Sequence, residues 1–279
     1  MRPADLLRYR GMVVGAALVV GFVAASLLAP WLSPFDPRAV PTGLAAASLT
    51  SPGAPHAFGT DVLGRDLLSR VLYGGRVSLL VGVGVELPVV LIGTTIGLLA
   101  GYYGGWLDSL LMRITDVVMA FPSLVLAIGL IAVFEQPGLD KVFLVLVLLG
   151  WTTIARVVRG QVLALREREY VQAAQALGVR DRVILLRHLL PNCLGPILVA
   201  ATIGVGGNMV AEAGLSFLGL GAQAPTISWG AMLAEGQTFL ASAPWVAVFP
   251  GLALMLGVLG VNLLGDGLRD LLDPRFRAL

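Results

Sequence analysis

The sequence predicts an all-α polytopic membrane protein. Hydrophobic residues make up 57% of its 279 positions, charged residues only 13%, and the mean hydropathy is +0.88. A soluble domain carries roughly a quarter charged residues, so a chain this apolar has too little polar surface to cover itself and needs lipid as its solvent. Several apolar runs reach the roughly 20 residues that a helix needs to cross a bilayer. The sequence does not show the alternating segments of about ten residues that are typical of a membrane β-barrel.

Six of these runs are long and apolar enough to be membrane-spanning helices. The first has no charged residue, the second holds a single acid, Glu86, and the fifth begins with Pro191, which a helix tolerates in its first turn. Arginines precede the first run as in a signal sequence, but its length and Pro30 favour a retained signal-anchor helix over a cleaved one. The predicted spans are residues 11–32, 77–100, 112–134, 142–158, 189–211 and 245–264.

The distribution of positive charge predicts the orientation, because cytoplasmic loops of membrane proteins collect arginine and lysine. With the N-terminus placed in the cytoplasm, the outer segments hold 5 of the 19 positive residues and the inner segments hold the other 14. We therefore expect both termini in the cytoplasm. The chain then divides into residues 1–76, with the N-terminal tail, first span and outer loop; residues 77–268, the transmembrane domain; and residues 269–279, a cytoplasmic tail.

The outer loop at residues 33–76 is predicted to be irregular in its proline-rich first half and helical in its second half. Thr60 or Asp61 can cap this short helix, which should lie on the membrane face or on other spans. Two acid–arginine pairs at i,i+4 spacing and an apolar stripe at helical spacing favour it. The pairs are Asp61–Arg65 and Asp66–Arg70, and the stripe is Leu63, Leu67, Leu68, Val71 and Leu72.

Two further features concern helix packing and the outer face. Gly93, Gly97 and Gly101 repeat at four-residue spacing in and just after the second span, which lets two helix backbones approach closely within one bundle. The stretch 212–244 is long and glycine-rich, with a short apolar helix predicted at 229–240. This stretch either shapes an outer mouth that meets a substrate-delivery protein, or simply packs over the bundle.

The inner loop at residues 159–190 is far too long to be a simple turn. It predicts two short helices, 167–177 and 181–190, separated by Gly178 in a left-handed C-cap. Asp181 can cap the second helix, which continues through Pro191 into the fifth span. The pattern therefore predicts a rigid projection that is tied to a transmembrane helix.

The first of these helices is predicted to present a low surface to another protein. Tyr170, Val171, Ala174 and Leu177 are expected to share one face. Ala173 and Ala174 keep the surface low, so a groove of a partner can close around it. Taken by itself, the segment is equally typical of an ordinary amphipathic cytoplasmic helix.

The inner loop resembles the "EAA" loop of the permease subunits of ABC importers. The residues that carry this resemblance are QAAQALG at 172–178, followed by Leu189, Leu190 and Pro191. Other stretches resemble the second-permease type of the dipeptide, oligopeptide and nickel branch. They are FGTDVLGRDLLSR at 58–70, AGYYGGWLD at 100–108, EAGLSFLGLG at 212–221 and SWGAM at 228–232.

The resemblance runs from the first span to the C-terminus and implies a type I ABC importer permease fold. It implies that the inner loop forms a coupling helix seated in an ATPase subunit. The residues implied in that contact are Tyr170, Gln172, Ala173, Ala174, Gly178, Leu190 and Pro191. One departure is that Gln172 stands where the family pattern has an acid, which removes a charge that Glu167 and Glu169 can replace.

The same resemblance implies the partners and the cellular location. The chain would pair with a homologous permease as a heterodimer, above two ATP-binding subunits, and receive peptides or nickel chelates from an extracytoplasmic solute-binding protein. ATP and Mg would belong to the ATPase subunits, with no cofactor in this chain. The location implied is the inner or plasma membrane of a bacterial or archaeal cell. A net charge of +2 is too small to suggest nucleic-acid binding.

Enzymatic chemistry is not expected in this chain. A P-loop ends in Gly-Lys-Ser or Gly-Lys-Thr, and the only lysine, Lys141, follows Leu139 and Asp140 instead. Ser216 needs a base within reach to act as a nucleophile, and neither His56 nor His188 falls within a predicted span. Clusters of histidine and cysteine for a metal are absent from the sequence. We therefore predict a transport subunit with no catalytic residue and no metal site.

A self-sufficient secondary transporter or channel is the alternative function. Ionisable groups inside a membrane mark such proteins, and Glu86 is the only acid deep in a predicted span. Glu86 can line a substrate path or bond a neighbouring helix. The structural interpretation is favoured because no second buried charge completes a relay.

Overall fold

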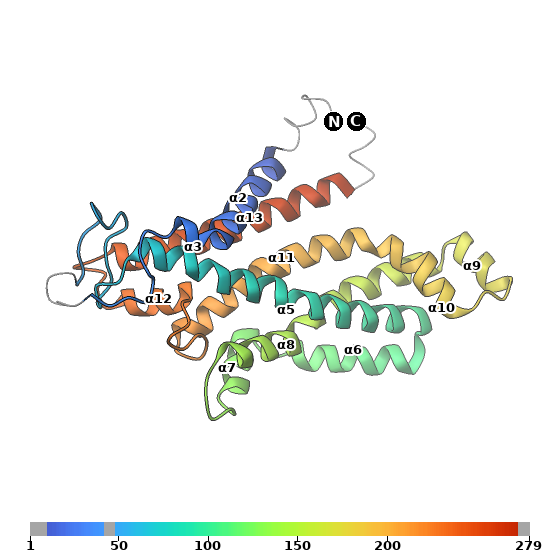
Figure 1. Ribbon diagram of the computed structural model, residues 1–279. Coiled ribbons are helices and arrows are strands. Elements are labelled where there is room, and N and C mark those ends of the chain that lie inside the picture. Colours follow the sequence, from blue (N-terminus) through green and yellow to red (C-terminus); the bar gives the residue numbers. More distant parts are fainter. Residues whose placement is uncertain (1–9, 42–47, 273–279) are drawn as a thin grey trace.

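The three-dimensional description comes from a computed structural model, which describes residues 10–41 and 48–272. Most of the long helices lie side by side in one bundle, from which the ends of α2 and α13 diverge as a pair (Figure 1). The bounds of the helical elements, η1 being a π-helix, are α2 Arg10–Leu27, α3 Ala29–Leu32, α5 Leu67–Tyr103, α6 Gly105–Met119, α7 Ser123–Ile131, α8 Leu139–Arg166, α9 Glu169–Ala176, α10 Asp181–Val183, η1 Ile184–Leu189, α11 Leu190–Phe217, α12 Trp229–Gln237 and α13 Trp245–Leu272.

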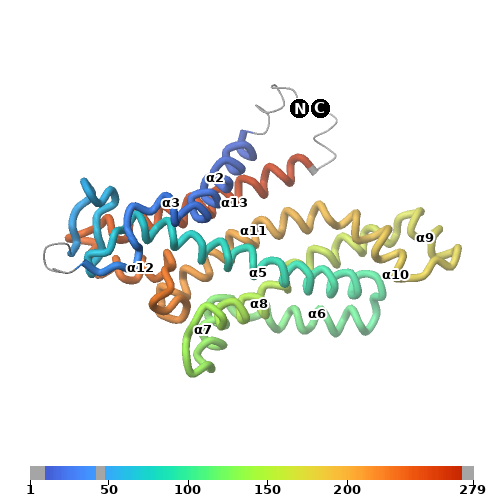
Figure 2. Tube along the Cα trace, viewed as in Figure 1, coloured from blue at the N-terminus to red at the C-terminus, as the bar shows by residue number. Residues whose placement is uncertain are grey.

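The described residues contain five helices that are long and apolar enough to cross a membrane, namely α2, α5, α8, the run from α10 to α11, and α13. The pair α6 and α7 makes a sixth span if the two are counted together. Chain direction alternates, since α2 and α11 run opposite to α5, α8 and α13 (Figure 2). The predicted all-α polytopic fold is confirmed. The arginines counted at positions 2, 8, 275 and 277 lie outside the described residues.

Helix α5 replaces two predicted elements with one continuous helix. Asp66 caps it by accepting a hydrogen bond from the backbone N–H of Ser69 at 2.8 Å. The prediction of a separate short helix capped by Thr60 or Asp61 was wrong. The Asp61 carboxylate accepts the backbone N–H groups of Leu63 and Arg65, so these residues form a turn instead of a helix. The expected division at residue 76 therefore falls inside an unbroken helix.

The two predicted charge pairs of this region have different outcomes. Asp61 and Arg65 form an ion pair at 2.6 Å. The predicted Asp66–Arg70 pair was wrong, because the Asp66 carboxylate is engaged by the helix cap and by His56 at 2.9 Å. Arg70 turns instead to Asp61, at 3.3 Å. Neither pair therefore belongs to the separate short helix that was predicted from the two pairs.

The third predicted span, 112–134, is not a straight helix. It is divided between α6 and α7, which meet at a bend of 83°. Pro122 lies at the break, between Met119 and Ser123. A proline disfavours helical geometry in the residue before it and lacks the N–H that would continue the hydrogen-bond ladder, so α6 ends there and α7 starts in a new direction.

Helices α5 and α8 pack closely through the predicted glycine pattern. A Cβ atom on Gly97 would lie 2.6 Å from the carbonyl oxygen of Ala155 and 2.7 Å from Cβ of Val158. Gly93 and Gly101 face the same helix, at Ile154 and Val162. The backbones therefore approach too closely for any larger residue, and the interpretation of the pattern as packing within one bundle is confirmed.

Helix α12 packs at the end of the bundle that carries the outer loop, and it confirms a short helix at 229–240 in a slightly shorter form. The Trp229 indole is buried, and its Nε1–H donates to the carbonyl of Val71 at 2.8 Å. Gly74 leaves room for this ring, and Phe22 of α2 packs on it at 5.2 Å between ring centroids. Elements from across the sequence thus meet on one tryptophan.

Candidate functional site

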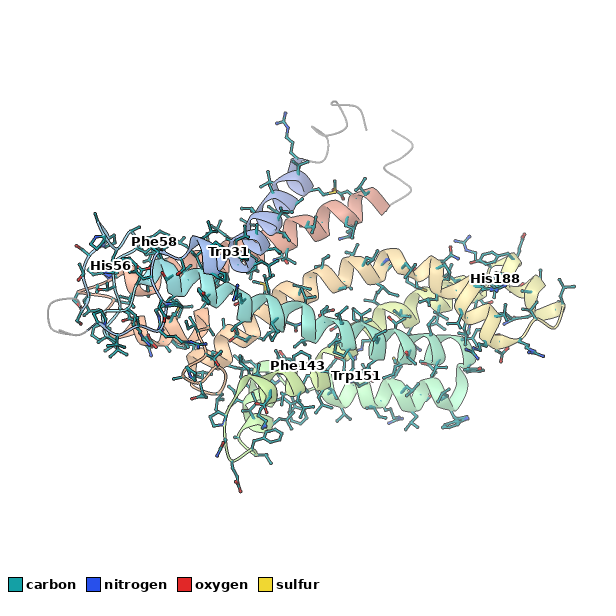
Figure 3. All side chains as sticks on the ribbon, viewed as in Figure 1. Trp31, His56, Phe58, Phe143, Trp151 and His188 are labelled. Atoms are coloured by element: carbon teal, nitrogen blue, oxygen red, sulfur yellow. The ribbon has the colours of Figure 1, made fainter. Side chains whose placement is uncertain are left out.

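The inner loop forms a projection at one end of the molecule. We define the projection as residues 167–189, which comprise α9, α10 and η1. It lies at the opposite end of the bundle from the outer loop and α12 (Figure 1). Figure 3 shows His188 in the projection and His56 at the far end. A partner that binds the projection therefore contacts a surface well separated from the outer loop.

Helix α8 extends further into the predicted loop than expected. It was predicted to end near residue 158, with the loop beginning at residue 159, but the helix ends at Arg166. Its continuation is stabilised by charge, because Arg159 forms two hydrogen bonds with the carboxylate of Asp108, at 2.5 and 2.6 Å. The projection is consequently shorter and is mounted directly on two long helices.

The turn after α9 is built around Gly178 as predicted. Gly178 has a φ of 70°, in the left-handed region where a side chain is strained. The N–H of Gly178 donates to the carbonyl of Gln175, and the N–H of Val179 donates to that of Ala174. These two bonds are the Schellman motif, and the side chains of Ala174 and Val179 belong to the same apolar cluster. The turn therefore fixes the direction in which the chain leaves α9.

The predicted shared face of α9 was wrong in two of its four members. Val171 and Ala174 are buried, at 0% and 7% exposure, and pack toward the bundle. Tyr170 is 45% exposed and Leu177 is 83% exposed. The four residues therefore do not share one face. They divide between a buried side and an exposed side of this segment.

The seven residues of the predicted coupling contact fall into three groups. The exposed group is Tyr170, Gln172, Ala173, Gly178 and Pro191, Leu190 is half-buried, and Ala174 is buried. Ala174 therefore packs against the bundle, beneath the exposed side of α9. The amide of Gln172 donates only a long hydrogen bond, 3.4 Å, to the carbonyl of Glu167, whose own carboxylate pairs with Arg166 at 3.1 Å.

The second half of the projection runs into α11 without a break. Asp181 was predicted to cap it, but Arg180 occupies the cap position, and no side chain makes a capping bond there. The turn before Pro191 is a π-helix, η1. A proline has no N–H and its ring crowds the carbonyl four residues earlier, so a wider turn is the expected accommodation. The projection and α11 therefore form one continuous helical path.

Glu86 lies at a contact between α5 and α11. Its side chain is buried, and Asn208 donates a hydrogen bond to Oε2 at 2.9 Å. A Cβ atom on Gly204 would collide with the carboxylate, so the group fills the space that this glycine leaves. The geometry matches the structural interpretation of Glu86, in which it bonds a neighbouring helix.

Two groups of contacts were not predicted from the sequence. Glu235 of α12 joins the outer loop by ion pairs to Arg65 at 3.1 Å and to Arg70 at 3.2 Å. At the end of α5, Tyr102 contacts the projection, and Gly101 accepts a hydrogen bond from Arg166 just before it. The signal available was that these arginines and this tyrosine lie in the stretches 58–70 and 100–108, which had been singled out as motifs.

Comparison with known proteins finds permease components of transport systems. Residues 93–278 match the family described as binding-protein-dependent transport system inner membrane component. A dipeptide transport system permease protein of Alkalihalophilus pseudofirmus is 43% identical, over 95% of this chain and 86% of that protein. A putative peptide transport system permease protein of Brucella abortus is 43% identical, over 98% and 90%. A glutathione transport system permease protein of Escherichia coli is 44% identical, over 97% and 88%.

Proposed function

Since the chain belongs to the family of binding-protein-dependent transport system inner membrane components, we propose that it is a permease subunit of an ATP-driven importer of short peptides. The relatives are named for dipeptide, peptide and glutathione transport, which favours peptides over nickel chelates. The observation that carries the proposal is the projection. It is a rigid, exposed element that continues into a membrane-spanning helix, as a mechanical link to an ATPase requires.

The proposed function requires three kinds of partner, namely ATP-binding subunits, a homologous permease and a solute-binding protein. ATP and Mg bind to two ATP-binding subunits that seat on the projection, because this chain has no Gly-Lys-Ser or Gly-Lys-Thr segment. A homologous permease completes the pathway, and an extracytoplasmic solute-binding protein delivers the peptide at the end formed by α12 and the outer loop. The chain holds no cofactor of its own in this scheme.

In the proposed orientation, the projection and both termini lie in the cytoplasm of the cell. The arginine distribution favours this arrangement. The start of α2 and the end of α13 both point away from the end that carries α12 and the outer loop (Figure 2), which agrees with a cytoplasmic position for both chain ends. The protein is then a multi-pass component of the inner membrane.

Transport in this scheme is a change of helix tilt driven from the projection. When the ATPase subunits close on ATP, they pull on α9. The hydrogen bonds of the Schellman turn at Gly178 fix the direction of α9 relative to α10 and η1, so these elements move with α9. Because η1 continues into α11, the displacement tilts α11 relative to its neighbours. The tilt opens the pathway alternately to the outside and to the inside.

The proposal is tested with the assembled transporter in lipid vesicles. The chain is reconstituted with its partner permease, both ATPase subunits and the binding protein, and uptake of a labelled dipeptide is measured with and without ATP. We expect uptake that depends on ATP and on the binding protein. Ala173→Trp, which places a large side chain on the exposed side of α9, should abolish it, whereas Ala173→Ser should not. Uptake unaffected by Ala173→Trp in an assembled complex would refute the coupling role.

The alternative of a self-sufficient carrier or channel is separated by a simpler arrangement. The purified chain alone is placed in vesicles with an ion gradient and no ATPase subunit. Our proposal predicts no uptake above that of empty vesicles. Uptake of the dipeptide by the chain alone would favour the carrier and would direct attention to Glu86.

A further inference from the structure

The end of α5 makes polar contacts with the projection on both sides of the Gly178 turn. The hydroxyl of Tyr102 donates to Oδ1 of Asp181 at 2.8 Å. The side-chain amide of Gln175 donates to the same hydroxyl at 3.5 Å. Gln175 lies on α9 and Asp181 is the first residue of α10, so one hydroxyl joins both sides of the Gly178 turn to α5.

The end of α8, which leads into the projection, also contacts this end of α5. Arg166, the last residue of α8, donates from Nη1 to the backbone carbonyl of Gly101 at 3.1 Å. Gly101 itself packs directly on Val162, where an added Cβ would lie 2.8 Å from the Cβ of Val162. The last residues of α5 therefore contact Arg166, just before the projection, and both sides of the Gly178 turn within it.

Helix α5 is in turn attached to α11 near the middle of both helices. The carboxylate of Glu86 on α5 fills the space above Gly204 and accepts a hydrogen bond from Asn208, both on α11. Two routes from the projection to α11 follow from these contacts. One route is the continuous path through η1, and the other passes through Tyr102, along α5 and across the Glu86 contact.

We propose that Tyr102 is a positioning residue that couples α5 to the projection, so that α5 and α11 move together when the ATPase subunits act. The inference rests on the proposed function, because it assigns the route by which that movement spreads. Without the Tyr102 hydroxyl, the projection can still be pulled and can still tilt α11. Helix α5 then follows incompletely, and ATP is hydrolysed with less transport.

The test uses the reconstituted complex and two neighbouring tyrosines. Tyr102→Phe removes one oxygen atom, and Tyr103→Phe is the matched control, since Tyr103 is 51% exposed and lies one residue further along. Dipeptide uptake and ATP hydrolysis are measured on the same vesicles. We expect Tyr102→Phe to lower uptake per ATP about fivefold, on the order expected for one lost hydrogen bond, with ATP hydrolysis maintained. Tyr103→Phe should leave the ratio unchanged.

Substitutions at Asp181 distinguish positioning from general support of the structure. Asp181→Asn keeps an oxygen that accepts from the tyrosine, and should retain normal uptake per ATP. Asp181→Ala should behave like Tyr102→Phe, and the double variant Tyr102→Phe with Asp181→Ala should be no worse than either alone. Additive losses in the double variant would overturn the inference.

The remaining outcomes are equally decisive. An unchanged ratio in Tyr102→Phe, an equal loss in Tyr103→Phe, or failure of the Tyr102→Phe complex to assemble would each contradict a positioning role. A wrong assignment of the proposed function would give a different result from a wrong assignment of Tyr102. In that case the unmodified complex would show no ATP-dependent uptake, whatever residue occupies position 102.

Discussion

Leu177 offers the sharpest test of how the projection binds its partner. Its side chain is 83% exposed at the end of α9, where it packs against almost nothing in its own chain. Replacing it with alanine removes three carbon atoms, each worth about 0.8 kcal/mol when buried. If the partner covers the exposed part of the side chain, Leu177→Ala costs about 2 kcal/mol of binding free energy. That loss corresponds to about a 30-fold weaker affinity.

The assay measures the affinity of the isolated ATPase subunits for the permease pair held in lipid nanodiscs. Leu240→Ala is the matched control, because Leu240 is 54% exposed but lies just after α12, at the opposite end of the molecule. We expect the loss of affinity in Leu177→Ala alone, with the thermal stability of the permease unchanged. Equal affinities for all three proteins would refute the assignment of the exposed side of α9 as the docking surface.

Three further predictions concern the turn, the helix packing and the buried acid. Gly178→Val should reduce ATP-driven uptake several-fold, because a residue with a side chain costs about 1–2 kcal/mol in the left-handed conformation of position 178. Gly178→Asn should retain most of the uptake, and equal uptake by the two variants would contradict this reasoning. Gly97→Val should destabilise the solubilised protein by about 1–3 kcal/mol. Gly160→Ala, whose added Cβ meets no neighbour within 4 Å, should not lower the melting temperature, because alanine is favoured over glycine inside a helix. Glu86→Gln, which can still accept from Asn208, should keep uptake within about twofold, and a complete loss would instead support a proton relay.

The sequence predicted the parts of the fold that depend on local pattern. Apolar runs gave the spans, and the glycine at position 178 gave the left-handed turn, because these signals are carried by the segment itself. The sequence failed where two local signals competed. Asp61 and Asp66 are both good capping residues, and only the bonds that Asp61 makes within its own turn leave Asp66 as the cap of α5.

The remaining errors have a tertiary origin. The direction of α7 depends on how the chain packs after Pro122, which no local pattern specifies. In α9 the spacing placed Tyr170 and Leu177 with Val171 and Ala174, but α9 is only eight residues long and only Val171 and Ala174 within it are buried. The contact of Tyr102 with Asp181 joins residues 79 positions apart, so its motif was visible in the sequence but its partner was not.

The central claim is that the projection is the surface on which the ATPase subunits act. Site-directed cross-linking of the assembled complex tests it most directly, with Leu177→Cys at the projection and Leu240→Cys at the outer end, because the only native cysteine, Cys193, is buried. With a short cysteine-to-amine reagent, we predict that position 177 captures an ATPase subunit and position 240 does not. Capture of an ATPase subunit from position 240, with none from position 177, would contradict the account.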